Sequence, residues 1–166
     1  AFPAPRQSAP FNTAPDPTNP ASDVTTGCVA GNGDDTIWLP PMAVFAVADP
    51  IDDYDNPTGP TATPIVTSVI DIEGQGARFQ RQPLGRLTRA FAVAPDGDLT
   101  LHEMDIKGFA IRGGNGAEGG GGGLGAGGAV YVVGGRLGIG WTTFEGNTAT
   151  GGNGGSAHYA SGFGGG

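Results

Sequence analysis

Cysteine, basic residues and long apolar runs are all scarce in this chain of 166 residues. The single cysteine, Cys28, excludes a disulfide within the chain, so it serves either as a buried thiol or in a bond to a second copy. Only 8 Lys and Arg stand against 16 Asp and Glu, and the formal net charge of -8 argues against nucleic acid and anionic membranes as partners. No apolar run approaches the length of a membrane span, so none is expected.

Proline and glycine divide the chain into two parts. All 14 prolines lie at or before Pro95, whereas most of the 33 glycines follow it. Residues 1–26 combine many prolines with few large apolar side chains, which predicts an extended arm that is ordered only where it lies on a surface. Phe2 and Phe11 are its expected anchors. The remaining residues, 27–166, are expected to form one domain.

Short runs in which apolar and polar residues alternate recur along this domain. A period of two predicts strands with one buried face, and the glycines that bracket them leave no room for helical crossovers. Two copies of one unit lie 38 residues apart, so that Leu99, Leu101 and Ile106 in one correspond to Leu137, Ile139 and Phe144 in the next. Repeats of this size predict stacking, hence an all-β parallel β-helix (solenoid) of few coils. Its expected core columns are Ile70, Ile72, Leu99, Leu101, Ile106, Leu137, Ile139 and Phe144.

Several motifs also resemble known families. GGAVY at Gly127–Tyr131 followed by FEGN at Phe144–Asn147 resembles the GGA-I and F-x-x-N signatures of polymorphic outer-membrane-protein repeats. A longer run resembles bacterial CSLREA-domain, or choice-of-anchor, surface proteins, and it covers about two thirds of the chain. The residues that carry this second resemblance are Gly27–Ile37, Leu39, Pro40, Pro64–Thr67, Ile70–Ala77 and Asp98–Leu101. Both resemblances imply a right-handed parallel β-helix on or outside a bacterial cell, without a defined activity.

Charged residues gather in two loops. The acidic loop is either a calcium site without EF-hand spacing or a solvated loop, and it holds Asp49, Asp52, Asp53 and Asp55. The basic stretch either pairs with that loop, within the chain or between copies, or is solvated, and it holds Arg78, Arg81, Arg86 and Arg89.

Glycine dominates an insert at residues 113–128 and a tail at residues 160–166. The insert is expected to be either a flexible loop or a tightly packed layer of polyproline-II-like backbone. It lacks the Lys-Ser/Thr of a phosphate loop. A last strand that begins near residue 156 would leave a raw edge for a second copy to complete. Contacts between copies are expected at Phe2, Phe11, Cys28, Tyr159 and Phe163.

Catalysis has few candidate residues. Alternation places four carboxylates and one histidine on outward strand positions, where polar residues are usual in any case, namely Asp71, Glu73, Asp98, Asp105 and His102. No Ser-His-Asp, metal-ligand or redox cluster stands out in the sequence. We therefore expect no enzyme activity, no catalytic or metal-binding residue and no cofactor.

Together these features favour an extracellular structural protein, a subunit of a filament, sheath or surface layer built by solenoid stacking, whose partners are other copies of itself. An adhesin-like or glycan-binding surface domain is the alternative, which exposed aromatic residues near Trp38, Tyr54 or Trp141 would mark; a polysaccharide lyase or hydrolase is a third. The start at Ala1 rather than Met adds the expectation of a removed signal peptide and of secretion or display at a bacterial cell surface.

Overall fold

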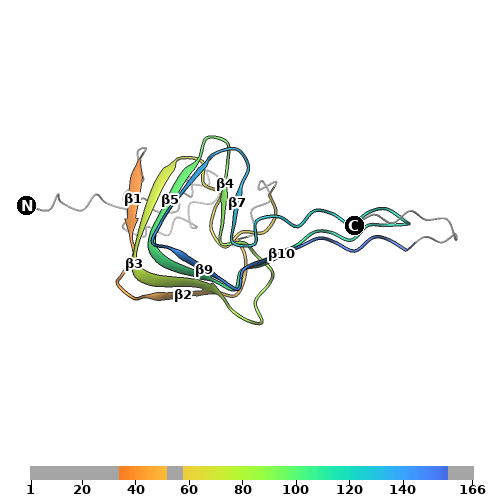
Figure 1. The fold of residues 1–166 in the computed structure, drawn as a ribbon, viewed down its shortest axis with the longest axis horizontal. Coiled ribbons are helices and arrows are strands. Elements are labelled where there is room, and N and C mark those ends of the chain that lie inside the picture. The colour runs from red at the N-terminus through yellow and green to blue at the C-terminus, as the bar shows by residue number, and fades with distance from the viewer. Residues whose placement is uncertain (1–33, 52–57, 157–166) are drawn as a thin grey trace, which may run out of the picture.

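The computed structural model describes residues 34–51 and 58–156 of the chain (Figure 1). All regular structure in these residues is β-strand, and parallel strands stack as a β-solenoid of about three turns, as the alternation predicts. The strands are β1 (Asp35–Trp38), β2 (Val44–Val47), β3 (Val69–Arg81), β4 (Phe91–Val93), β5 (Asp98–Lys107), β6 (Ala110–Arg112), β7 (Val130–Val132), β8 (Arg136–Gly140), β9 (Thr143–Glu145) and β10 (Thr148–Thr150).

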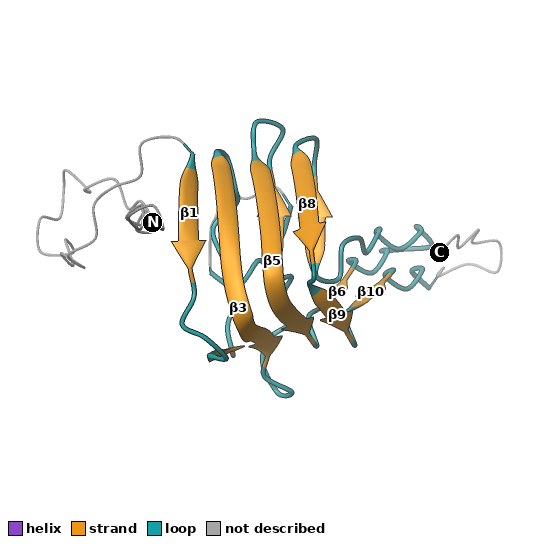
Figure 2. Cartoon of the chain, turned by 60° about the vertical axis from the view of Figure 1, so that its left-hand side comes forward, coloured by secondary structure: helices purple, strands orange, loops and turns teal. Residues whose placement is uncertain are grey.

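The largest sheet has the order β1-β3-β5-β8, with β2 added to the second half of β3 and β9 to the second half of β5 (Figure 2). Leu99 and Leu101 of β5 are fully buried, and their neighbours Thr100 and His102 face outward, so the period of two separates core from surface. The register aligns the inward side chains in columns, which run Ile70–Leu99–Leu137, Ile72–Leu101–Ile139 and Phe79–Ile106–Phe144.

A corner divides each coil into two walls. At this corner Met42, Gln75, Glu103 and Trp141 all have positive φ, at 56°, 51°, 49° and 44°. Residues other than glycine rarely adopt this left-handed conformation, so one such residue in each coil marks a shared turn rather than isolated strain. β3 and β5 pass through the corner as continuous strands, with a shift of register between Glu73 and Ala77, and both ribbons bend there in Figure 2.

The core fills the space between the walls. β4 pairs with β7 to form the wall opposite the main sheet. Phe79 lies between Phe91 and Phe109, with ring centroids 5.5 and 5.0 Å apart and tilted planes. Burying a side chain of this size contributes about 1.5–3 kcal/mol, and Phe109, which is fully buried, is one of the largest such side chains in the core.

The glycine-rich insert forms a projection that leaves the body beside β6 and β10 (Figure 1). Three chain segments lie side by side in it, residues 113–117, 120–125 and 150–155, and each donates backbone hydrogen bonds to the next in a cycle. The bonds recur at steps of three, as in Gly113 N to Thr150 O at 2.9 Å and Gly116 N to Asn153 O at 2.8 Å. Three residues per turn is the repeat of a polyproline-II helix.

Backbone packs directly on backbone within this projection. A Cβ atom at Gly122 would lie 2.0 Å from the carbonyl oxygen of Gly152, and one at Gly152 would lie 1.9 Å from that of Gly114. Gly125, three residues after Gly122, is equally close to Thr150 O, at 2.0 Å. Of the two arrangements that the glycine content allows, the structure has the packed backbone layer.

Candidate functional site

The last described coil leaves one strand edge open. β8 and β9 pair with β5 on one side, and on the other side no described strand pairs with them. Ile139 and Phe144 therefore remain 54% and 41% exposed, whereas Leu101 and Ile106, their neighbours in the same columns, are completely buried. Both residues thus hold the column positions expected from the sequence. No side chain among the described residues covers them on the open side.

The first described coil has a corresponding open edge. β1 and β2 pair with β3 alone among the described strands. Phe45, which continues the column of Phe79 and Ile106, is 38% exposed, so apolar surface is also uncovered at this end. The two ends of the solenoid therefore carry the same kind of surface, a free parallel strand edge with uncovered apolar side chains.

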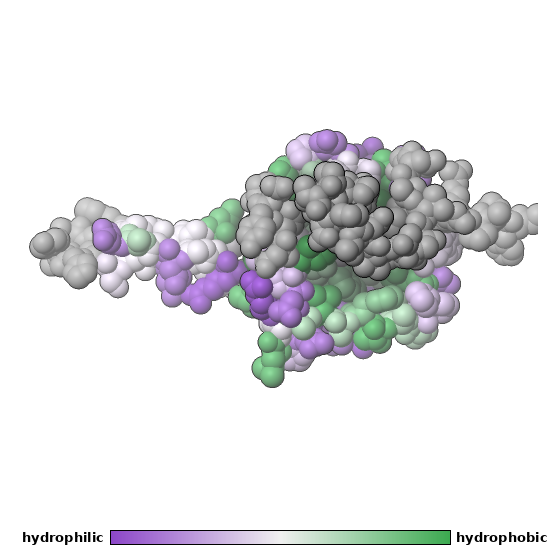
Figure 3. Space-filling model, turned by 180° about the vertical axis from the view of Figure 1, so that it is seen from behind, coloured by the Kyte–Doolittle hydropathy of each residue, from purple (hydrophilic) through white to green (hydrophobic). Residues whose placement is uncertain are grey.

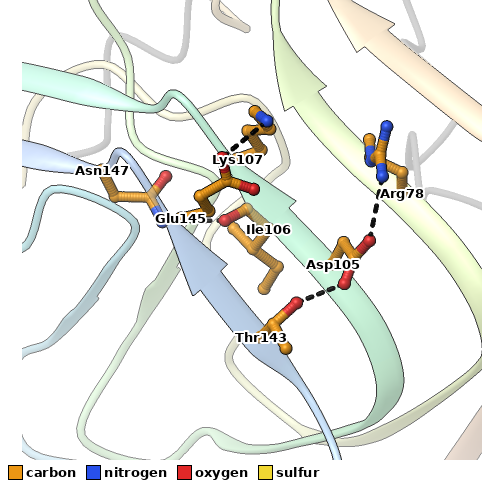
Figure 4. Close-up of polar contacts among 7 residues, drawn as sticks. All are labelled: Arg78, Asp105, Ile106, Lys107, Thr143, Glu145 and Asn147. Atoms are coloured by element: carbon orange, nitrogen blue, oxygen red, sulfur yellow. Dashed lines mark hydrogen bonds and ion pairs between the residues drawn. The ribbon is translucent and has the colours of Figure 1, made fainter.

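Polar pairs join successive coils on the outer surface beside the corner (Figure 4). Arg78 Nη2 lies 3.2 Å from Asp105 Oδ2, Thr143 donates to the other oxygen of Asp105, and Lys107 Nζ lies 2.8 Å from Glu145 Oε1. The hydrogen bond from Thr143 and then the one from Arg78 lower the pKa of Asp105 below its ordinary value. These side chains are largely exposed, so their effect is to favour one register between coils more than to stabilise the fold.

Two other arginines of the basic stretch lie where the chain turns. Arg81 donates to three backbone carbonyls, of Gly108 and Gly85 at 2.8 Å and of Gln82 at 3.1 Å. Arg86 is exposed, and its backbone N–H donates to Ala48 O at 2.8 Å. The side chain of Arg81 therefore supplies donors to carbonyl groups that no strand ladder satisfies.

Arg89 is the arginine that lies inside the protein, with 5% of its surface exposed. Its guanidinium donates to Ala126 O at 2.9 Å and to Thr58 O, and it lies 5.0 Å from the ring centroid of Tyr131. Burial lowers the pKa of Arg89, and the Tyr131 phenol acts in the opposite direction. Carbonyl oxygens and an aromatic ring thus surround this cation. Because Ala126 belongs to the glycine-rich insert and Thr58 to the body, Arg89 connects the base of the projection to the body.

Many of the residues expected to form charge pairs or contacts between copies lie outside the described residues. Asp52, Asp53 and Asp55 are among these residues, as are Tyr54, the arm at 1–26 and the tail at 160–166, so calcium binding and pairing of that loop stay predictions. Asp49 is described and exposed. The expected contacts between copies that also lie outside are Phe2, Phe11, Cys28, Tyr159 and Phe163.

Asn147 is a structural residue whose role the sequence reasoning missed. It follows Gly146 at the end of β9, and its carboxamide reaches the neighbouring coil. Its Oδ1 accepts from Phe109 N at 2.9 Å, and its Nδ2 donates to Ile106 O at 2.8 Å. The F-x-x-N motif was the available signal, because an asparagine side chain can satisfy a donor and an acceptor of the backbone at once.

The outward face of the main sheet gathers the remaining sequence candidates. Trp38, Glu73 and His102 hold equivalent outward positions on β1, β3 and β5, and Gly140 holds this position on β8. Asp71 lies one outward position away from Glu73 on the same strand. Asp98 lies one outward position before Thr100, the neighbour of Asp71, and pairs with Arg136 at 3.6 Å, whereas Asp105 is on the other side of the corner.

Comparison with family models, with curated proteins and with solved structures found no match for this chain. The described residues contain no helix that is long and apolar enough to cross a membrane. The open edges and the outward face are the features of the described residues that bear on function.

Proposed function

We propose that this protein is an extracellular structural protein that assembles head to tail by solenoid stacking into a filament, sheath or surface layer. One observation carries the proposal: the inward columns of the core run out to both ends and stop there uncovered, with Phe144 at one end and Phe45 at the other. A second copy placed in register would cover both at once. Open, flat, apolar edges without such cover are otherwise a liability for a β-protein.

The register within the chain specifies which residues would meet. If β8 of one copy pairs with the free edge of β1 in the next copy, the columns continue across the contact. Ile139 then lies against Ile37, and Phe144 against Phe45. At the start of the same strands Arg136 would meet Asp34, which repeats the alternation of charge that already pairs Arg136 with Asp98. Two apolar positions and one pair of opposite charges thus match in this alignment, whereas Leu137 would meet Asp35.

Electron microscopy and analytical ultracentrifugation of the full chain test this proposal. Native protein should form regular fibres, and Phe144→Lys or Phe45→Lys should leave monomers, because a charge at an edge opposes strand addition. Leu84→Lys is the matched control, since Leu84 is 101% exposed on the loop after β3 rather than on an edge strand and should not affect assembly. Monomers of the native chain, or fibres unaffected by both edge variants with unchanged melting temperatures, would refute stacking.

A glycan-binding surface domain is the second candidate function. The observation that favours it is the exposure of both tryptophans, Trp38 at 55% and Trp141 at 84%. Tryptophan is enriched at binding surfaces, because its ring packs on an apolar face of the partner while its N–H can donate a hydrogen bond. Glycan-array screening of the full chain tests this candidate, and a lack of binding to any glycan would refute it.

A further inference from the structure

We propose that the outward face of the main sheet binds an uncharged glycan chain, which lies across the strands between Trp38 and Trp141. This inference deepens the second candidate function and does not depend on assembly. It assigns the ligand class, the direction of the ligand on the sheet and the residues that hold it.

The site follows from the register of the four strands (Figure 2). One outward row crosses the sheet at right angles to the strands and consists of Trp38, Glu73, His102 and Gly140, with Trp141 directly after it. The neighbouring row consists of Thr36, Asp71, Thr100 and Gly138. Adjacent strands lie about 4.8 Å apart, so each row is about 14 Å long. A flat row of this length suits an extended polymer.

Trp141 lies at the corner after β8, where each of the other coils also has one residue with positive φ. Its φ of 44° is left-handed, which is unfavourable for a bulky side chain, and its side chain is 84% exposed. Its ring lies at 76° to that of His102, with 6.3 Å between centroids. The exposed indole of Trp141 therefore offers a ligand an apolar ring at one end of the outward row.

Glycines on β8 make room for outward side chains of the neighbouring strand β5. A Cβ atom at Gly140 would lie 2.5 Å from Cε1 of His102, so the imidazole occupies the place where a side chain would begin. A Cβ atom at Gly138 would lie 3.2 Å from the Thr100 side chain. At these two positions β8 has no outward side chain of its own, the side chains of His102 and Thr100 lie against its backbone, and Trp141 follows directly after Gly140.

The chemistry of the two rows selects the ligand. The faces of indole rings pack against the C–H groups of pyranose rings, and a tryptophan stands at each end of the row. Between them Asp71 and Glu73 accept hydrogen bonds from sugar hydroxyls, and Thr36 and Thr100 both donate and accept. The two rows contain carboxylates but neither Lys nor Arg, so an acidic glycan would be repelled. An uncharged chain satisfies all of these groups.

Isothermal titration of the full chain with cellohexaose and chitohexaose tests the proposal, with polygalacturonate and oligolysine as charged probes. At least one uncharged probe should bind and change tryptophan fluorescence. Trp141→Gly and Trp38→Ala should each weaken binding by about tenfold or more, as expected when an aromatic anchor is removed. Leu124→Ala is the control, since Leu124 is 85% exposed on the projection and should bind like the native chain.

The glycine variant separates binding from folding. Glycine adopts φ near 44° without strain, so Trp141→Gly should keep or raise the melting temperature while it loses the ligand. Binding that survives in both tryptophan variants would overturn the site and leave the second candidate function standing. Binding of polygalacturonate or oligolysine in preference to the uncharged probes would overturn the ligand class. A lack of binding to all probes would overturn both the site and the ligand class.

Discussion

The body and the projection of this protein are stabilised in opposite ways. In the body, side chains with a period of two fill a core around Leu99, Leu101 and Phe109. In the projection, glycines with a period of three let backbone pack on backbone, and no side chain is needed inside. Figure 3 shows the contrast, since green apolar residues gather on the body while the projection is largely pale. A solenoid can therefore continue beyond its apolar core where glycine occupies the positions that face the neighbouring segments.

Both regions nevertheless keep one offset along the chain. Lys107 bonds Glu145 in the body, and Asn115 accepts from Asn153 N in the projection, each across 38 residues. The projection is thus the same pair of coils, continued outward past β6 and β10. What changes is the source of cohesion, from apolar burial to backbone hydrogen bonds, and the two should respond differently to mutation.

The largest expected effect is in the body. Leu101→Ala removes a fully buried side chain between Ile72 and Ile139 and should lower the free energy of unfolding by about 2–5 kcal/mol. Chemical denaturation followed by circular dichroism measures this loss, which should be global because the whole solenoid shares the core. A loss below about 1 kcal/mol would mean that the columns do not carry the stability of the body.

The projection should respond locally and to much smaller changes. Gly122→Ala adds one methyl group 2.0 Å from Gly152 O and should cost about 1–3 kcal/mol by overpacking. Hydrogen exchange should accelerate in residues 113–125 and 150–155 and stay slow in β5. Gly114→Ala is the matched control, because a Cβ atom there meets nothing within 4 Å. Equal exchange in both variants would contradict backbone packing.

Asn147 links the coils at the boundary between the two regions. Asn147→Ala leaves Phe109 N and Ile106 O without their partners and should cost about 1–3 kcal/mol. Thermal unfolding measures the loss, and Asn153→Ala serves as a comparison because its bond to Asn115 uses the Asn153 backbone N–H rather than its side chain. A neutral Asn147→Ala would show that water replaces the carboxamide.

The smallest expected effect depends on pH. The pKa of Asp105 is lowered from an ordinary value of 3.8 by Thr143 and Arg78, so the charged form favours the folded state. This contribution is present above the ordinary value and is lost as the pH falls through the lowered pKa, hence below about pH 4. Asp105→Asn should flatten the fall of melting temperature in that range only, and an identical fall in both proteins would contradict the pairing.

Sequence and structure agree where one rule governs a whole column. Alternation and the offset of 38 residues identify Leu99, Leu101, Ile106 and their partners, because a buried face is specified by side-chain type alone. They could not identify the partners of Arg81 and Arg89, since backbone carbonyls leave no trace in a sequence. Nor could they decide between a flexible and a packed insert, because the period of three in glycine is hidden among the additional glycines that face solvent.

Fibre diffraction from assembled protein tests the central claim of stacking most directly. Four parallel strands per copy, joined edge to edge in the main sheet, predict a meridional reflection at about 4.8 Å and an axial rise of about 19 Å per subunit. Such a pattern would show that β8 and β9 of one copy continue into β1 and β2 of the next. Dispersed monomers at high concentration, or fibres without the 4.8 Å spacing along their axis, would contradict the account.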